Sequence, residues 1–162
     1  MKDGKVTETI FMETTKIAPG RSAGQITEAL IGAGATQIAT DYKNGKIVGL
    51  RWTMAVEGQD LLFSMPARVT PVFELLKKRL QQRRTFSPSP ADLIQLQEKA
   101  ERIAWRQLLR WVQAQVAMME IGMVKAREVF LPYWRPGGND STLFELLENN
   151  RFKALPAPGE QG

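Results

Sequence analysis

The chain has 162 residues, of which 43% are hydrophobic and 24% are charged, and its formal net charge is +5. This composition is typical of a folded globular protein, and the length suits one domain with a hydrophobic core. Because the sequence contains no cysteine and no histidine, it excludes disulfides, thiol catalysis, thiolate or imidazole metal sites, and serine triads with a histidine base.

The sequence pattern indicates neither a signal peptide nor a membrane helix. The N-terminus, MKDGKVTETI, lacks the apolar centre of a signal peptide, and no run approaches the roughly 18 apolar residues that a membrane helix needs. We therefore expect a cytoplasmic protein that does not contact a membrane. We expect one α+β domain over residues 1–153, with a sheet part at 6–66, a helical part at 70–150 and a flexible tail at 154–162.

The first elements are a strand and a short helix. Residues 6–17, VTETIFMETTKI, are rich in threonine and β-branched residues, which favours a strand at a sheet edge. Ser22 followed by Gln25 matches a capping box. An apolar stripe follows and stops at glycines, so we expect a helix over residues 22–33.

The clearest pattern lies between residues 35 and 66. Three segments that alternate in polarity, ATQIATDY, KIVGLRWTMAV and DLLFSMP, are separated by KNG and EGQ, which predicts a three-stranded antiparallel meander. We expect a three-residue loop with a bulge at 43–45, because a tight turn at Asn44 and Gly45 would pair Ile38 with Arg51.

Each face of this sheet has a different character. The apolar face is expected to hold Ile38, Val48, Leu50, Trp52, Met54, Val56, Leu61, Phe63 and Met65. Helices must cover it. The other face, with Gln37, Asp41, Arg51, Thr53, Ala55 and Ser64, is either solvated or a binding platform.

Helices dominate the rest of the chain. Pro71 suits the first position of a helix that ends in KKRLQQRR, and TFSPSP forms a linker. Ser89 then caps the next helix and Pro90 opens it. From residue 91 this helix can run without a breaker to about residue 121. Gly122 ends or bends it, and Ser141 caps a last helix at 142–149. The predicted fold is an antiparallel meander sheet with one helix before it and long helices packed on one face.

The second half of the longest helix is apolar over most of its girth. Such a helix is covered on both sides, and in a chain of this size a second subunit could supply the cover. We therefore expect a homo-oligomer. Its interface would comprise Trp105, Leu109, Val112, Val116 and Met119.

Positive charge is concentrated between Lys77 and Arg110. This segment holds nine basic and three acidic residues, so it carries +6 while the rest of the chain carries about −1. Such asymmetry favours a polyanionic partner, although a solvated helix face would have the same composition. The candidate phosphate contacts are Lys77, Lys78, Arg79, Arg83 and Arg84, extended by Arg102, Arg106 and Arg110, with Arg51 as an outlying candidate. Phe86 either stacks on a base or plugs the joint between two helices.

Catalytic signals are weak. PGRSAGQIT has Gln25 where a phosphate-binding loop needs lysine. The carboxylate pairs Glu98 with Glu101 and Glu145 with Glu148 lie on polar ridges, where nothing would shift their pKa values. We expect no catalytic residue, no metal and no cofactor.

Three stretches resemble a family of small bacteriophage and prophage proteins. They are TTKIAPGRSAGQITEALIGAGATQIATDYKNGKIVGLRWTM, ERIAWRQLLRWVQAQVAMMEIGMVKAREVFLPYW and STLFELLE. The family has no assigned activity, so the resemblance implies a viral setting, with the host cytoplasm as location. The order of elements is also similar to the core of phage and eukaryotic single-strand annealing proteins, which implies a nucleic-acid ligand.

These observations predict a protein that binds single-stranded nucleic acid without sequence specificity, in phage DNA replication or recombination. An alternative is an interaction protein that inhibits a host factor or sequesters a small anionic signal, through FLPYW at 130–134 or a pocket between subunits. A third is a structural phage component. FLPYW itself is either an oligomer contact or a lid on the core.

Overall fold

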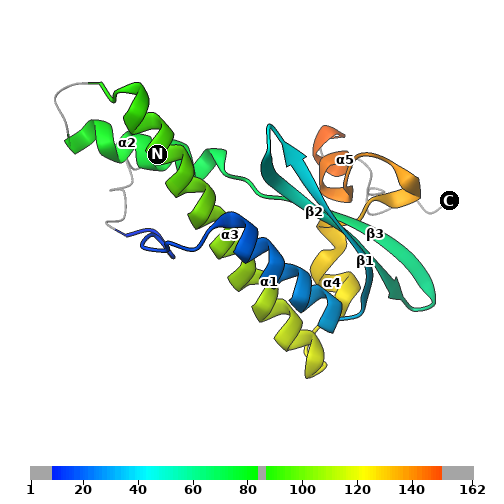
Figure 1. Cartoon of the computed structure of the whole chain (residues 1–162). Helices are drawn as coiled ribbons and strands as arrows, with labels where there is room; N and C mark the ends of the chain where they lie inside the picture. Colours follow the sequence, from blue (N-terminus) through cyan, green and yellow to red (C-terminus); the bar gives the residue numbers. More distant parts are fainter. Residues whose placement is uncertain (1–8, 84–86, 151–162) are drawn as a thin grey trace, which may run out of the picture.

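The computed structural model describes residues 9–83 and 87–150. Its elements in chain order are α1 (Pro19–Gly32), β1 (Ala35–Lys43), β2 (Lys46–Val56), β3 (Gln59–Pro66), α2 (Thr70–Arg83), α3 (Pro90–Glu120), α4 (Ala126–Phe130), the 3₁₀ helices η1 (Leu131–Tyr133) and η2 (Pro136–Gly138), and α5 (Leu143–Asn149). The predicted α+β class is confirmed, because α1 precedes a three-stranded antiparallel sheet and α3 packs on both (Figure 1). The predicted tail at 154–162 lies outside the described residues.

Helix α1 begins earlier than the sequence predicts. Pro19 opens it after Ala18, whose extended backbone offers no side-chain cap. Proline suits this position because its fixed φ matches the helix and it has no N–H to satisfy. Ser22 is fully buried inside the helix, so the predicted capping box of Ser22 and Gln25 is wrong.

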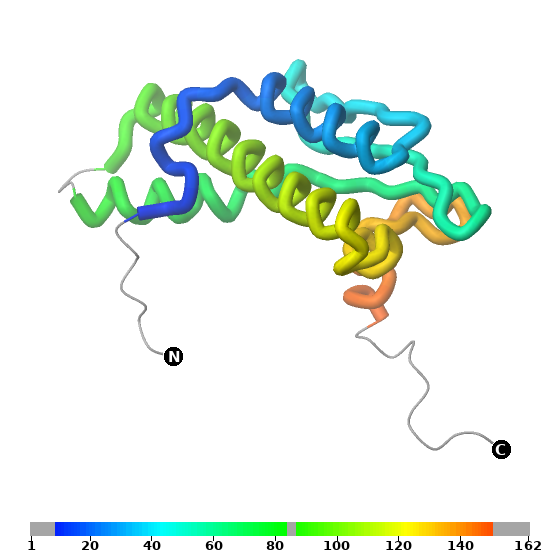
Figure 2. Tube along the Cα trace, turned by 90° about the horizontal axis from the view of Figure 1, so that it is seen from below, coloured from blue at the N-terminus to red at the C-terminus, as the bar shows by residue number. Residues whose placement is uncertain are grey.

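The predicted strand at 6–17 is also wrong for the described residues 9–17. They form a turn at residues 11–14 and no strand, and residues 6–8 lie outside the described chain. We call residues 9–18 the strap, because they run from the α2 side of the structure across α3 to the start of α1 (Figure 2). Ile10 packs against the α2–α3 contact, and the side-chain amide of Gln107 donates to the backbone oxygen of Phe11 over 2.8 Å.

Both turns of the meander are tight two-residue turns. Asn44 and Gly45 have φ of 52° and 74°, and Glu57 and Gly58 have φ of 51° and 80°. Positive φ at both positions defines the type I′ turn that matches strand twist. Lys43 pairs with Lys46 across the first turn, so the predicted three-residue loop is wrong.

The predicted bulge exists, but it lies inside the strands. Asp41 pairs with Gly49 and Tyr42 pairs with Ile47, which leaves Val48 without a partner in β1. The extra residue restores the register that a tight turn alone would lose, so Ile38 lies opposite Trp52. It also places Ile47, and not Val48, against the core.

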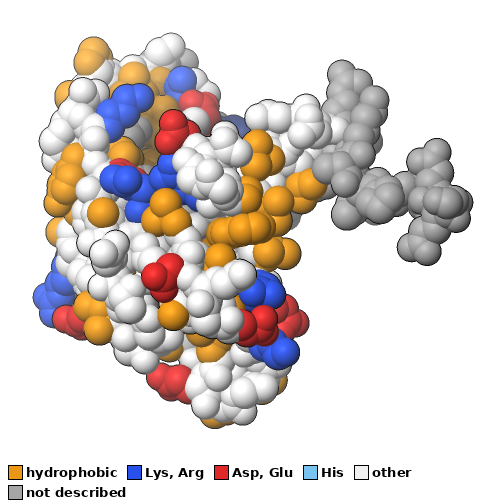
Figure 3. All heavy atoms as spheres, turned by 90° about the vertical axis from the view of Figure 1, so that its right-hand side faces the viewer, with side chains coloured by type: hydrophobic (Ala, Val, Ile, Leu, Met, Phe, Trp, Pro, Cys, Tyr) orange, Lys and Arg blue, Asp and Glu red, His pale blue; other side chains and the backbone are white. Residues whose placement is uncertain are grey.

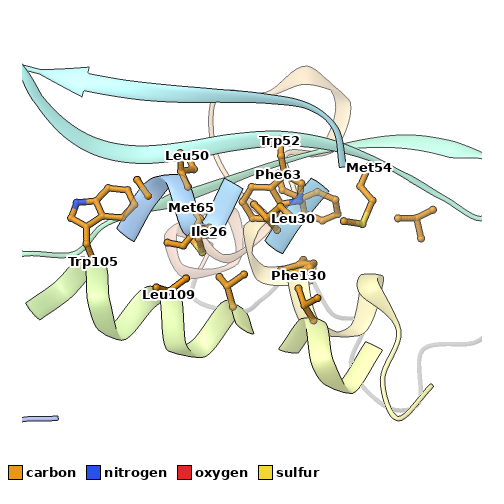
Figure 4. Close-up of a cluster of buried hydrophobic side chains, with 14 residues drawn as sticks. Ile26, Leu30, Leu50, Trp52, Met54, Phe63, Met65, Trp105, Leu109 and Phe130 are labelled. Carbon is orange, nitrogen blue, oxygen red and sulfur yellow. The ribbon is translucent and has the colours of Figure 1, made fainter. Parts of the chain in front are cut away.

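The other residues of the predicted apolar face are confirmed. Leu50, Trp52, Met54, Val56, Phe63 and Met65 are buried, and Ile38 and Leu61 pack against them. Helices α1, α3 and α4 cover this face, as predicted (Figure 4). The rings of Trp52 and Phe63 stack with centroids 5.4 Å apart, and the ring of Phe130 meets both at their edges.

The side chains that the sequence assigns to an oligomer interface along α3 are packed within one copy of the chain. Trp105, Leu109 and Val112 are fully buried, and Val116 is 7% exposed. Figure 4 shows Trp105 and Leu109 pointing from α3 toward the sheet. Met119 packs against the same cluster. The expectation of a homo-oligomer stays a prediction from the sequence.

The first half of α3 packs elsewhere. Leu76 of α2 and Ala100 and Ile103 of α3 form a second, smaller core. The predicted start of α3 is confirmed, because Ser89 and Asp92 form a capping box ahead of the helix. Gly122, with φ of 76°, follows its end. The last helix is capped by Thr142 instead of the predicted Ser141.

Candidate nucleic-acid interface

Three of the predicted phosphate contacts remain accessible on α2. Lys78 and Arg83 are exposed, and Lys77 is half-buried. The structure gives none of the three an ion pair with a described residue. We call Lys77, Lys78 and Arg83 the hairpin cations, since α2 and α3 form a helical hairpin. Arg84 and Phe86, the other candidates at this end, lie outside the described residues.

Arg79 has a structural role instead. It is 9% exposed, and its Nη1 donates to Glu13 Oε1 of the strap over 2.9 Å. Lys99 Nζ lies 3.6 Å from the same carboxylate oxygen. Arg79 therefore anchors the strap, and its predicted contact with phosphate would require a ligand to displace Glu13.

The carboxylate of Glu13 has a perturbed pKa. The backbone N–H of Ile10 donates to Glu13 Oε2 over 3.1 Å, and this bond lowers the pKa of Glu13 most. Partial burial acts in the opposite direction, and the charges of Arg79 and Lys99 lower the pKa further. Glu13 is therefore an ionised clamp that holds the strap to both helices of the hairpin.

The arginine ridge of α3 divides between the interior and the solvent. Arg102 and Arg106 are half-buried, and Arg106 Nη1 donates to Gln25 Oε1 of α1 over 2.6 Å. The Nε atoms of Arg102 and Arg106 are buried without a hydrogen-bond partner among the described residues. Arg110 is exposed, and its Nη1 donates to the side-chain oxygen of Gln113 over 3.0 Å. Arg102 and Arg110 have no ion pair with a described residue, and Arg110 is the more exposed of the two.

Arg51 lies on the polar face of the sheet and is neutralised there. Its Nη2 lies 2.6 Å from Asp41 Oδ1, and its Nε also donates to this carboxylate. The hydrogen bond to Asp41, followed by the charge of Asp41, raises the pKa of Arg51. Arg51 is therefore a weak candidate for a phosphate contact, since a ligand would have to displace its partner.

The basic residues that the sequence assigns to one continuous track differ in their surroundings. Glu13 pairs with Arg79 and lies near Lys99, Gln25 of α1 accepts a hydrogen bond from Arg106, and Asp41 pairs with Arg51 on the sheet. The hairpin cations, Arg102 and Arg110 have no ion pair with a described residue.

The chain matches no family model, no curated protein and no solved structure. The similarity to phage proteins therefore stays a prediction from the sequence. None of the helices in the described ranges combines the length and hydropathy needed to span a bilayer. Within those ranges, no group of three acidic side chains is placed to hold a metal ion.

The FLPYW segment covers the core. Phe130 is fully buried against Trp52 and Phe63, Leu131 is 40% exposed, and Tyr133 and Trp134 are half-buried. Trp134 also forms an isolated antiparallel bridge with Phe63 of β3. Of the two interpretations that the sequence leaves open, the structure favours the lid.

Sequence reasoning missed a group of cations that surround one hollow. A hollow of about 640 Å³ lies between the first turn of the meander and the start of α2, and exposed Lys43, Lys46 and Arg68 line it. No motif marks these residues, because they are single cations in three separate parts of the chain. Only the pairing of the strands and the packing of α3 bring them together.

Proposed function

We propose that the protein binds single-stranded nucleic acid without sequence specificity and without catalytic chemistry. The proposed setting, phage DNA replication or recombination, rests on the resemblance in the sequence. The observation that carries the proposal is the set of hairpin cations, which have no ion pair among the described residues. Cations that are not neutralised by their own protein release counterions when phosphates bind, and this release drives non-specific binding.

The distribution of charge over the rest of the surface supports the same proposal. On the face that carries the meander ends and α5, basic and acidic side chains lie next to one another, beside a hydrophobic patch (Figure 3). Elsewhere in the described chain, three ion pairs join the cations of the sheet and the C-terminal elements to acids, namely Arg51 with Asp41, Arg127 with Glu57 and Arg135 with Asp140. A polyanion gains little on such a face. The hairpin end of α2 is the stronger electrostatic attractor.

The test is a salt titration of binding to a fluorescein-labelled oligothymidine, followed by anisotropy. In the variant with Lys78→Gln and Arg83→Gln, the slope of log K against log salt should fall by about 1.4, since each lost contact with single strands removes about 0.7. Both side chains are exposed and have no ion pair with described residues, so the fold should persist.

The matched control is Lys16→Gln with Arg21→Gln. It removes the same two residue types from exposed positions on the strap and α1, and the salt slope should stay within error of wild type. Absence of binding at low salt would contradict the proposal, and so would equal slopes for the two double variants.

A further inference from the structure

Three hollows meet around one exposed arginine. Arg68 lies in the connection between β3 and α2, and it lines the 640 Å³ hollow and two smaller ones of about 250 and 210 Å³. The two smaller hollows also share Pro66 and Tyr133. The three hollows therefore adjoin one another around Arg68, and together we call them the Arg68 groove.

Cations gather at one end of this groove. Lys43 and Lys46 extend from the tight first turn of the meander into the largest hollow. Glu101 also lines it, but its Oε1 lies 2.7 Å from Lys46 Nζ, so this acid is already paired. Lys43 and Arg68 have no ion pair with a described residue. This end of the groove attracts an anion.

Aromatic rings line the other end. Trp111 and Tyr133 border the 250 Å³ hollow, and Tyr133 and Phe144 border the 210 Å³ hollow. All three are half-buried, so each keeps part of its ring accessible. The guanidinium carbon of Arg68 lies 5.5 Å from the centroid of the Phe144 ring. A planar cation beside aromatic rings is a surface on which nucleic-acid bases stack.

Glu145 determines which end of the groove the phosphates of a bound nucleic acid would avoid. Its carboxylate lines the 210 Å³ hollow at the aromatic end, and one of its oxygens accepts the Thr142 backbone N–H over 2.8 Å. Its charge repels phosphate, whereas a neutral base tolerates it. Phosphates are therefore favoured beside Lys43 and Arg68, and bases beside Tyr133 and Phe144.

From this arrangement we infer that the Arg68 groove is a site for the bases and adjoining phosphates of single-stranded nucleic acid. The inference rests on the proposed function and adds a second contact region to it. The groove begins where α2 starts, and the hairpin cations lie about 10 to 20 Å further along this helix. A duplex would keep its bases stacked and paired, so the site favours single strands.

The decisive variant is Arg68→Gln, compared with Arg21→Gln, in the oligothymidine anisotropy assay. Arg68→Gln should weaken affinity about tenfold, because it removes both a phosphate contact and a stacking partner. Arg21→Gln removes the same charge from an exposed position on α1 and should change affinity less than twofold. Lys43→Gln, which alters an exposed turn residue, should give an intermediate loss even if Arg68→Gln weakens the fold.

Tryptophan fluorescence supplies a second readout. Oligothymidine should quench part of the emission of wild-type protein, and Trp111→Phe should abolish this part while binding remains. If the wild type binds and its affinity is changed equally by Arg68→Gln, Lys43→Gln and Arg21→Gln, the groove is overturned and the proposed function stands. If the wild type fails to bind oligothymidine, both the groove and the proposed function are overturned. A labelled duplex that binds as tightly as the single strand would overturn the preference for single strands.

Discussion

Glu13 shows how one side chain determines the fate of several candidate ligand contacts. Its carboxylate holds Arg79 at 2.9 Å and Lys99 at 3.6 Å, and both would otherwise add to the basic surface of the hairpin. An acid contributed by a distant segment neutralises them, and no pattern in the helices themselves could have indicated this. The charge count of the hairpin in the sequence therefore overstates its accessible charge.

The lowered pKa of Glu13 makes the attachment of the strap depend on pH. A carboxyl group whose pKa is lower in the folded state adds stability above its unfolded pKa, and this contribution is lost as pH falls through the folded value. We expect the free energy of unfolding to fall on acidification below the ordinary glutamate range. In Glu13→Gln this component should be absent, and stability near neutral pH should be about 1–3 kcal/mol lower.

Urea denaturation across the acidic range checks this prediction. Glu28→Gln is the control, because Glu28 is exposed on α1 and has no ion pair with a described residue. If the free energy of unfolding depends on pH in the same way in the wild type and in Glu13→Gln, the proposed role of Glu13 in holding the strap is contradicted.

At the scale of elements, the sequence predicts most of the structure because local rules agree with the packing. The alternation of β2 and β3, the Ser89 cap and the stop at Gly122 all correspond to observed features. The errors arise where a tertiary contact overrides a local pattern. The strap has the composition of a strand, yet Ile10 packs on the hairpin and Glu13 pairs with Arg79, so no sheet edge is involved.

The first turn of the meander illustrates a limit of register arguments. A tight turn followed by uninterrupted pairing of the two strands would misalign their apolar faces. The chain solves the conflict with a tight turn and a bulge at Val48, within β2. The same face is reached by either route, so polarity alone cannot distinguish a bulge in the loop from a bulge in the strand.

The second turn contains a strained residue that can be improved. Glu57 has φ of 51°, which costs an ordinary L-residue about 1–2 kcal/mol. Asparagine tolerates this conformation and already occupies the equivalent position, Asn44, in the first turn. Glu57→Asn should raise the free energy of unfolding by about 0.5–1 kcal/mol.

Equilibrium denaturation measures the gain in free energy of unfolding. Glu57→Asn also removes the ion pair with Arg127, and Arg127→Ala measures the effect of losing this pair alone. Arg127 and Glu57 are 3.2 Å apart and largely exposed, so this pair contributes at most about 1 kcal/mol. A Glu57→Asn protein that is less stable than Arg127→Ala would contradict the assignment of strain to the turn.

At the scale of the whole molecule, the apolar side chains of α3 that the sequence assigns to a subunit contact lie in or against the core of one copy of the chain. The sequence could indicate that two sides of the helix are buried, but it could not say by what. The sheet and α1 bury Trp105 and Leu109, whereas α2 and the strap cover Ala100 and Ile103. Likewise the Arg68 groove has no signal in the sequence, because its cations and rings come from the meander, the β3–α2 connection, α3 and the C-terminal elements.

Replacement of Trp105 distinguishes a core position from a subunit contact. Trp105→Ala should lower the free energy of unfolding by about 3–5 kcal/mol, as expected for a buried aromatic residue. The midpoint of urea denaturation should not vary with protein concentration. Ile94→Ala is the control, since Ile94 lies on the same helix at 62% exposure and should cost less than about 0.5 kcal/mol.

Sedimentation velocity of wild type and Trp105→Ala completes the test. If Trp105 lined a subunit contact, the urea midpoint of the wild type would depend on protein concentration, and removal of the ring would lower the mass of the particle. Either result would overturn its assignment to the core.

Helix α3 has 31 residues, and its roughly 46 Å of uninterrupted rod forms a wall of both the sheet core and the hairpin core. No glycine or proline follows Pro90 within it, so it has no built-in joint at which the two halves could bend apart. If α3 unfolds from either end, the unfolding removes one side of the core packed against that end before it can stop. The deepest amide protons of the sheet and of the hairpin should therefore exchange with solvent through one shared opening event.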